Sequence, residues 1–278
     1  MTYGTQPTVN IDGFEIPQLG FGTWQLKGDD ARRMVGSALS QGYRHIDTAF
    51  IYENEAEVGQ GIKDAGIARS DFFLTTKIWV TNLTRDALLK QAEESAERLG
   101  STPDLLLLHW PKPEPDLMQT ITALNEAKAR GLTRAIGLSN YPSDLWQAAQ
   151  TMSEAKLVTN QVEYHPFLSI NALKAKAQEL GSSLTAWSPL ARGKVLDEPV
   201  IIEIAEKYGK SAGQVTLRWI TQQGLIAIPK TASESRAAEN LAIFDFALTD
   251  EEIARIAALA TGFRVGDHLD PAFTWDEA

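Results

Sequence analysis

The chain has 278 residues, of which 44% are hydrophobic, and this length is enough for one large domain or two small ones. Because the chain contains no cysteine, disulfides, cysteine-ligated zinc and thiol catalysis are excluded. A formal net charge of -10 disfavours nonspecific binding to nucleic acid and to anionic membrane surfaces, so we expect neither as a partner.

The N-terminal segment, residues 1–18, predicts a hairpin. It lacks the basic start and the apolar core of a signal peptide. No stretch of about 18 apolar residues occurs in the chain, so we expect no transmembrane helix and a cytoplasmic location. Asp12 and Gly13 separate two short runs, 9–11 and 14–16, and an Asp-Gly pair favours a two-residue hairpin turn.

After the hairpin, short apolar runs alternate with helical patterns. The strand candidates lie near residues 19–22, 43–48, 72–78, 104–109, 134–139, 158–162, 184–188 and 225–228. Helical patterns cover residues 29–41, 84–99, 117–130, 170–180, 198–208, 211–223, 233–243 and 249–259. Two of these helices fall between the seventh and eighth strands, and two follow the eighth.

Eight strands that alternate with helices predict an α/β fold, a closed (β/α)8 TIM barrel, as one domain over residues 1–278. We expect residues 261–278 to form a C-terminal tail that packs over one barrel end or frays. The rival fold is an open doubly wound sheet, which would normally show a Gly-x-Gly-x-x-Gly turn after its first strand. Residues 20–23, Gly-Phe-Gly-Thr, do not match that turn.

Polar side chains stand where three successive apolar runs end. Asp47, Lys77 and His109 close the second, third and fourth predicted strands, and Tyr52 follows Asp47 in the next loop. Polar groups are costly to bury unpaired, so several at corresponding strand ends predict one shared site. An acid, an amine, an imidazole and a phenol suit proton transfer. Taken singly, they could instead be a salt bridge, a core histidine and a loop aromatic.

Three motifs resemble the signatures of the aldo-keto reductase family. The first is Gly-Tyr-Arg-His-Ile-Asp-Thr-Ala at 42–49 with Tyr52, Glu55 and 58–59; the second is Ile-Gly-Leu-Ser-Asn-Tyr at 136–141; the third is Ile-Pro-Lys-Thr at 228–231 with Arg236, Glu239 and Asn240. The resemblance extends from about residue 9 to 260. Segments 77–79 and 159–166 look most like the bacterial 2,5-diketo-D-gluconate reductases, whose relatives also reduce methylglyoxal and other small aldehydes.

The resemblance implies that the chain reduces a carbonyl to an alcohol. It assigns Tyr52 as general acid, Lys77 and Asp47 as the pair that tunes it, and His109 as the residue that orients the substrate. A free tyrosine has a pKa near 10, and a nearby ammonium lowers that pKa. No side chain can supply a hydride, so a nicotinamide must do so.

The resemblance also implies NADPH (NADP+ when oxidised) as the cofactor. Lys230 and Arg236 would bind its 2′-phosphate, and the ring of Trp187 would stack on the nicotinamide. Ser139, Asn140 and Gln161 match the positions that hold the carboxamide, and Ser188, Leu190 and Gly193 would touch the pyrophosphate. The remaining cofactor-binding candidates are Thr23, Thr231, Glu239 and Asn240. No grouping of the histidines has the spacing of a metal site, so we expect no metal.

Four aromatic residues would surround the carbonyl. Trp24, Trp79 and Trp110 follow predicted strands, and Phe50 lies two residues before Tyr52. The short connection after Trp110 and the short tail predict an open pocket for a small polar carbonyl compound. We expect a monomer that reduces a keto sugar acid such as 2,5-diketo-D-gluconate. The alternatives are a broad methylglyoxal and aldehyde reductase for detoxification and a non-catalytic, cofactor-sensing regulatory subunit.

Overall fold

A computed structural model describes residues 6–276 as a hairpin, a parallel barrel and a surrounding layer of helices. The ends of the predicted hairpin segment and tail, residues 1–5 and 277–278, lie outside the described residues. The hairpin pairs β1 (Thr8–Ile11) with β2 (Phe14–Pro17), and Asp12 and Gly13 both have positive φ in the turn, as predicted.

The second sheet has eight parallel strands in sequential order, from β3 to β10. They are β3 (Phe21–Gly22), β4 (His45–Asp47), β5 (Phe73–Ile78), β6 (Leu105–Leu108), β7 (Ala135–Ser139), β8 (Leu157–Glu163), β9 (Ser183–Trp187) and β10 (Ile226–Ala227). The sheet closes on itself through a parallel bridge between Leu19 and Ala227 and a 3.0 Å hydrogen bond from Gly22 N to Pro229 O. The predicted α/β barrel is confirmed, and the open sheet is excluded.

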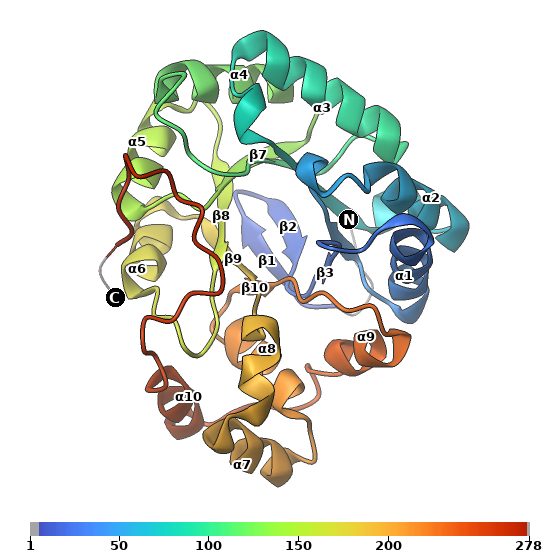
Figure 1. The fold of residues 1–278 in the computed structure, drawn as a ribbon, viewed down its shortest axis with the longest axis vertical. Coiled ribbons are helices and arrows are strands. Elements are labelled where there is room, and N and C mark those ends of the chain that lie inside the picture. The colour runs from blue at the N-terminus through green and yellow to red at the C-terminus, as the bar shows by residue number, and fades with distance from the viewer. Residues whose placement is uncertain (1–5, 277–278) are drawn as a thin grey trace.

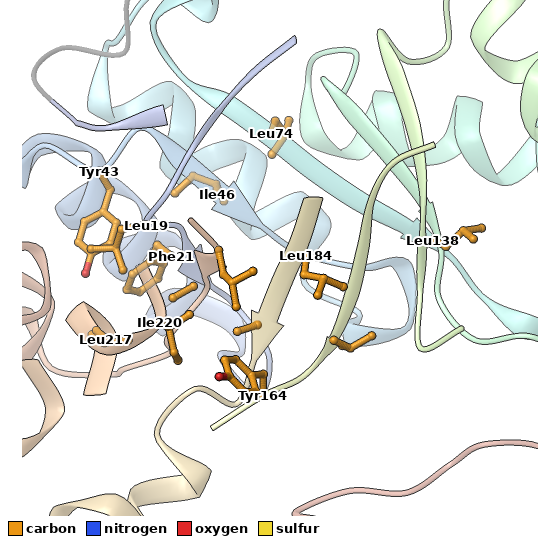
Figure 2. Packing of buried hydrophobic residues seen from close by; sticks show 14 of the residues in the cluster. Leu19, Phe21, Tyr43, Ile46, Leu74, Leu138, Tyr164, Leu184, Leu217 and Ile220 are labelled. Atoms are coloured by element: carbon orange, nitrogen blue, oxygen red, sulfur yellow. The ribbon is translucent and has the colours of Figure 1, made fainter. Parts of the chain in front are cut away.

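Helices surround the barrel as an outer ring (Figure 1). They are α1 (Gly28–Gln41), α2 (Glu55–Ala65), α3 (Arg85–Leu99), α4 (Leu117–Ala129), α5 (Ser143–Met152), α6 (Asn171–Leu180), α7 (Pro199–Tyr208), α8 (Ala212–Gln222), α9 (Glu234–Leu241) and α10 (Asp250–Ala257). The main core lies between this ring and the strands. Figure 2 shows one part of it, where the rings of Phe21 and Tyr43 meet edge to face with centroids 5.6 Å apart.

The hairpin closes the N-terminal end of the barrel. Ile16 of β2 is buried with Phe73, Leu105 and other side chains that point into the barrel from its N-terminal half. Figure 1 shows β1 and β2 lying across the centre of the ring. Among residues 6–276 the barrel is therefore closed at this end and opens at the carboxyl ends of its strands, which is where a barrel of this type carries its site.

Sequence patterns missed two helices, α2 and α5. The sequence of α2 contains Gly59 and Gly61, which weaken helix propensity by about 1 kcal/mol each relative to alanine. The structure shows why glycine is needed there: a Cβ at Gly61 would overlap the carbonyl oxygen of Arg32 in α1. Close packing between α1 and α2 therefore outweighs local propensity. The helix α5 begins after Pro142 and has no glycine at its end.

This packing gives a stability prediction. Gly61→Ala should lower the free energy of unfolding by about 1–3 kcal/mol, because the new methyl group overpacks the contact with α1. Gly36→Ala is the matched control, because its Cβ would lie 3.4 Å from Gly61 O, an ordinary contact. Urea denaturation of both variants measures the difference; a Gly61→Ala variant as stable as Gly36→Ala would contradict the packing argument.

Candidate active site

The barrel brings together the four polar residues predicted at strand ends. Asp47 ends β4, Lys77 lies near the end of β5 and His109 directly follows β6. Tyr52 ends the short 3-10 turn Phe50–Tyr52 that follows β4. Because neighbouring parallel strands end at the same edge of the barrel, their side chains converge there.

Lys77 lies at the centre of this group and is fully buried. Its Nζ donates to Asp47 Oδ1 at 2.6 Å, to the Thr48 carbonyl oxygen at 2.7 Å and to Tyr52 Oη at 3.4 Å. An ammonium has three N–H donors, so these three acceptors satisfy it completely. Burial alone would lower the pKa of Lys77, but Asp47 and Tyr52 outweigh that effect and hold the pKa above its ordinary value. Lys77 therefore remains a cation.

The pKa of Tyr52 is raised. Burial raises it, the Lys77 ammonium lowers it by a smaller amount, and the Asp47 carboxylate raises it further. The ammonium thus acts in the direction expected from the sequence, but desolvation determines the net shift. At neutral pH Tyr52 is a protonated phenol that keeps a proton to donate.

His109 is an uncharged imidazole. Burial is the main cause of a pKa well below 6.5, and the electrostatic influence of Lys77 and then of His268 lowers the pKa of His109 further. Its ring meets the rings of Tyr52 and Trp79 edge to face, with centroids 5.8 and 5.2 Å away. Nδ1 is buried and has no hydrogen-bond partner in residues 6–276, which leaves Nε2 as the nitrogen that can meet a ligand.

A hydrogen-bond network extends from Asp47 to the far wall of the mouth. Gln161 Nε2 donates to Asp47 Oδ2 at 2.6 Å, and Gln161 O accepts from Ser139 Oγ at 2.8 Å. Asn140 Nδ2 donates to Ser139 Oγ, and Asn140 Oδ1 accepts from Trp187 Nε1 at 2.8 Å. The network fixes the indole of Trp187 relative to the buried charges, so that one rigid polar frame holds both sides of the mouth.

The mouth encloses a cavity of about 340 Å³. A volume of this size suits a small ligand or one part of a larger one. Most of the predicted site residues line it: Thr23, Trp24, Asp47, Tyr52, Trp79, His109, Trp110, Ser139, Asn140, Gln161, Trp187, Ser188 and Lys230. Lys77 lies directly beneath it. The predicted catalytic group and most of the predicted pocket therefore share one space.

Sequence reasoning missed several residues of the cavity wall: Gly22, Gln25, Lys27, Ile51, Arg192, Ile228, Gly266 and His268. Arg192 lies in the segment already indicated by Leu190 and Gly193, and its guanidinium lies 5.1 Å from the centroid of the Trp24 ring across the mouth. Gly266 and His268 belong to the irregular tail, where no pattern in the sequence indicates a position in space.

Phe50 does not line the cavity, contrary to expectation. Its ring lies under the Arg98 guanidinium at 4.8 Å, and Ile51 lines the cavity in its place. Phe50 begins a 3-10 turn, which has about three residues per turn. Phe50 and Tyr52, two residues apart, therefore point to different sides of this turn. Phe50 therefore packs toward α3, and Tyr52 faces Lys77.

The other predicted cofactor residues lie outside the cavity wall. Leu190 and Gly193 lie in the segment after β9. Thr231 precedes α9, and Arg236, Glu239 and Asn240 lie within this helix, whose N-cap Ser233 accepts from Arg236 N. Arg236 and Lys230 are exposed, and within residues 6–276 neither forms an ion pair. Glu239 instead accepts from Ser211 Oγ of the neighbouring helix start.

The tail packs over the barrel mouth, so the pocket is less open than the short connection after Trp110 and the short tail predicted. Gly266 and His268 form part of the cavity wall, and the His268 ring meets Trp110 edge to face at 5.8 Å. Lys112, in the short connection after β6, forms a 2.9 Å ion pair with Asp270. The tail is short but covers one side of the mouth, because the His268 ring contact and the Lys112 ion pair hold it there.

The family expected from the three sequence motifs is the one that the comparison with known proteins finds. The sequence profile described as the Aldo/keto reductase family matches residues 18–261. The chain belongs to the aldo/keto reductase family. It is accordingly an oxidoreductase that acts on CH–OH groups with NAD(P).

Individual aldo/keto reductases match over almost the whole chain. A solved structure with the provisional name 2,5-diketo-D-gluconic acid reductase B is 45% identical, with a TM-score of 0.95 and 98% of each chain covered. The glyoxal reductase of Bacillus subtilis strain 168 is 41% identical, over 97% of this chain and 99% of the relative. An aldo-keto reductase of Bombyx mori in complex with NADP is 35% identical, with a TM-score of 0.89 and 95% of each chain covered.

Residues 6–276 of this reductase contain neither a membrane-spanning helix nor a cluster of metal-ligating side chains. No helix in that range combines the length and apolar character needed to cross a bilayer. Nor do three histidine or acidic side chains of that range come together as a metal site requires.

The buried Lys77–Asp47 pair gives a second stability prediction. Asp47→Asn removes the charge partner of a fully buried ammonium, so we expect the free energy of unfolding to fall by about 3–5 kcal/mol. The double variant Asp47→Asn/Lys77→Met should lose much less than the sum of the two single losses, since no unpaired charge remains. Denaturant titration of the four proteins tests this; strictly additive losses would contradict the pairing.

Proposed function

We propose that this reductase uses NADPH to reduce the carbonyl group of a small polar keto sugar acid, such as 2,5-diketo-D-gluconate, to an alcohol. The observation that carries the proposal is the contact of Lys77 Nζ with both Asp47 and Tyr52 at the base of a cavity that His109 also lines. A proton donor, a fixed positive charge and a neutral hydrogen-bond donor at the base of one cavity support the reduction of a carbonyl group there.

Each residue has a separate role at that point. A bound NADPH would supply, from its nicotinamide, the hydride that the carbonyl carbon accepts. Tyr52 gives its proton to the carbonyl oxygen, and the negative charge left on Tyr52 faces the Lys77 ammonium. Asp47 keeps Lys77 charged and in place. Neutral His109 donates a hydrogen bond from Nε2 to the same oxygen, polarises the carbonyl and orients it.

The residues present fit a phosphorylated dinucleotide. Lys230 and Arg236 are exposed cations beside the start of α9 with no ion pair in the described part of the chain. A 2′-phosphate would provide the partner that they lack, with the guanidinium as a fork and the ammonium as a point charge. Trp187, fixed by Asn140, offers a ring for the nicotinamide. Ser139 and Gln161, which the same hydrogen-bond network joins to Asn140, would hold the carboxamide of the nicotinamide.

The cavity suits a small substrate. Trp24, Trp79 and Trp110 line it on the side of β3, β5 and β6, and the tail closes another side. The cavity of about 340 Å³ would have to hold both the carbonyl compound and the nicotinamide end of the cofactor. The alternative substrate class is glyoxal, methylglyoxal and simple aldehydes, which the similarity to a glyoxal reductase favours.

A panel of carbonyl compounds with NADPH tests the proposal and separates its alternatives. We expect kcat/KM for 2,5-diketo-D-gluconate to exceed the values for methylglyoxal and benzaldehyde by at least about tenfold. Equal or higher values for the aldehydes would replace the keto acid with the detoxifying alternative. NADPH that binds but is oxidised with none of the compounds would support the regulatory subunit.

Tyr52→Phe should reduce kcat by at least about a hundredfold, because it removes the proton donor. The Kd for NADPH should stay within about twofold of the wild-type value, since the hydroxyl faces Lys77 and not the phosphate end. Tyr208→Phe, which removes a hydroxyl bonded to Glu252 on the outer helices, is the control and should retain its turnover. A Tyr52→Phe enzyme with normal kcat would refute the assignment.

Arg236→Ala should weaken NADPH binding by about ten- to a hundredfold and leave NADH binding almost unchanged, because only NADPH carries the 2′-phosphate. Arg255→Ala, which removes an exposed arginine paired with Glu203 on the far helices, controls for loss of surface charge. Fluorescence titration with both cofactors measures the effect. Equal weakening of NADPH and NADH by Arg236→Ala would rule out the phosphate contact.

A further inference from the structure

A buried acid–imidazole pair lies at the end of β8 and has no part in the proposed proton transfer. Glu163 and His165 are both buried, and His165 Nε2 lies 2.8 Å from Glu163 Oε1. A carboxylate in such a place requires several hydrogen-bond donors, because its remaining lone pairs cannot reach water.

The C-terminal tail supplies the other donors. The backbone N–H of Val265 donates to Glu163 Oε1 at 2.5 Å, and that of Gly266 donates to Oε2 at 3.3 Å. Hydrogen bonds to a carboxylate are roughly twice as strong as those between neutral groups. Glu163 therefore joins the barrel to the backbone of the tail, and this link does not depend on the side chains of the tail.

From this anchor the tail crosses the mouth. A Cβ on Gly266 would lie 3.5 Å from the Trp187 ring, so the backbone packs against the edge of the indole. Two residues later the ring of His268 packs on Trp110. The crossing ends where the Asp276 carboxylate accepts from Ser143 N at 3.1 Å, at the start of α5. Figure 1 shows this red segment passing α6 and reaching α5.

We propose that Glu163 is a positioning residue that sets the wall of the substrate pocket formed by Gly266 and His268. This proposal rests on the reductase activity proposed above, because that wall meets the carbonyl compound. Glu163 forms no hydrogen bond with Asp47, Tyr52, Lys77 or His109. Loss of the anchor should therefore impair substrate binding far more than the chemical step.

Glu163→Gln keeps the size of the side chain but removes its charge and leaves one acceptor oxygen for three donors. We expect KM for the best carbonyl substrate to rise about tenfold. The value of kcat and the Kd for NADPH should stay within about twofold of those of the wild type. Amide hydrogen exchange in a peptide covering residues 262–276 should be faster in the variant, and this readout does not depend on turnover.

Glu252→Gln is the matched control. Glu252 is also buried and also accepts several hydrogen bonds, from Lys207, Tyr208 and Thr249 N, but it lies on α10 away from the mouth. It should lower the melting temperature without changing KM. If Glu163→Gln behaves in the same way, Glu163 is only a stabilising residue and the proposal fails.

Val265→Pro provides a second approach, because proline has no backbone N–H to donate to Glu163. It should raise KM and tail exchange as Glu163→Gln does, and the double variant should be no worse than the more impaired single variant. Additive effects, or unchanged exchange in both single variants, would overturn the anchor. An absence of turnover in the wild type would refute the proposed function alone, because exchange still tests the anchor.

Discussion

The site depends on one ammonium group that is kept out of water. Lys77 is fully buried, and an unpaired charge in that position would cost several kcal/mol. Its three acceptors come from β4 and from the loop that follows it. The strand that carries Lys77 and the strand that carries Asp47 must therefore be neighbours in the correct register. The parallel pairing of β4 with β5 provides this arrangement, and the rest of the polar frame builds on it through Gln161.

The two ends of the site differ in how they treat charge. At the base, Lys77 is paired and desolvated, so that salt and water hardly reach it. Near α9, Lys230 and Arg236 are exposed and have no ion pair in the described residues. Exposed cations attract an anion over a distance, and salt screens that attraction within about 8–10 Å. The rate at which an anionic ligand binds should therefore depend on ionic strength. The interaction of the Lys77 ammonium with Tyr52 should not depend on it.

Much of the fold and the base of the site could be predicted from the sequence. Strand runs, glycine stops and polar strand ends are local signals, and the barrel brings corresponding strand ends together. Three features depended on contacts that are not local. The helix α2 forms because Gly59 and Gly61 allow close packing; Phe50 faces α3 because of the turn that contains it; and the tail is held by Glu163. The upward shift of the Tyr52 pKa could not be predicted either, because it depends on how deeply the side chain is buried, and the sequence does not show this.

The hairpin at the other end of the barrel has a consequence for the movement of protons. Ile16 and the apolar side chains buried with it close this end, and Lys77 itself is fully buried, so the described residues leave bulk water no route to the ammonium from that side. Every proton that exchanges with the Lys77–Tyr52 pair must travel through the mouth. A ligand bound in the mouth would therefore isolate the Lys77–Tyr52 pair from the solvent. The number of protons on the pair would then stay fixed until the ligand departs.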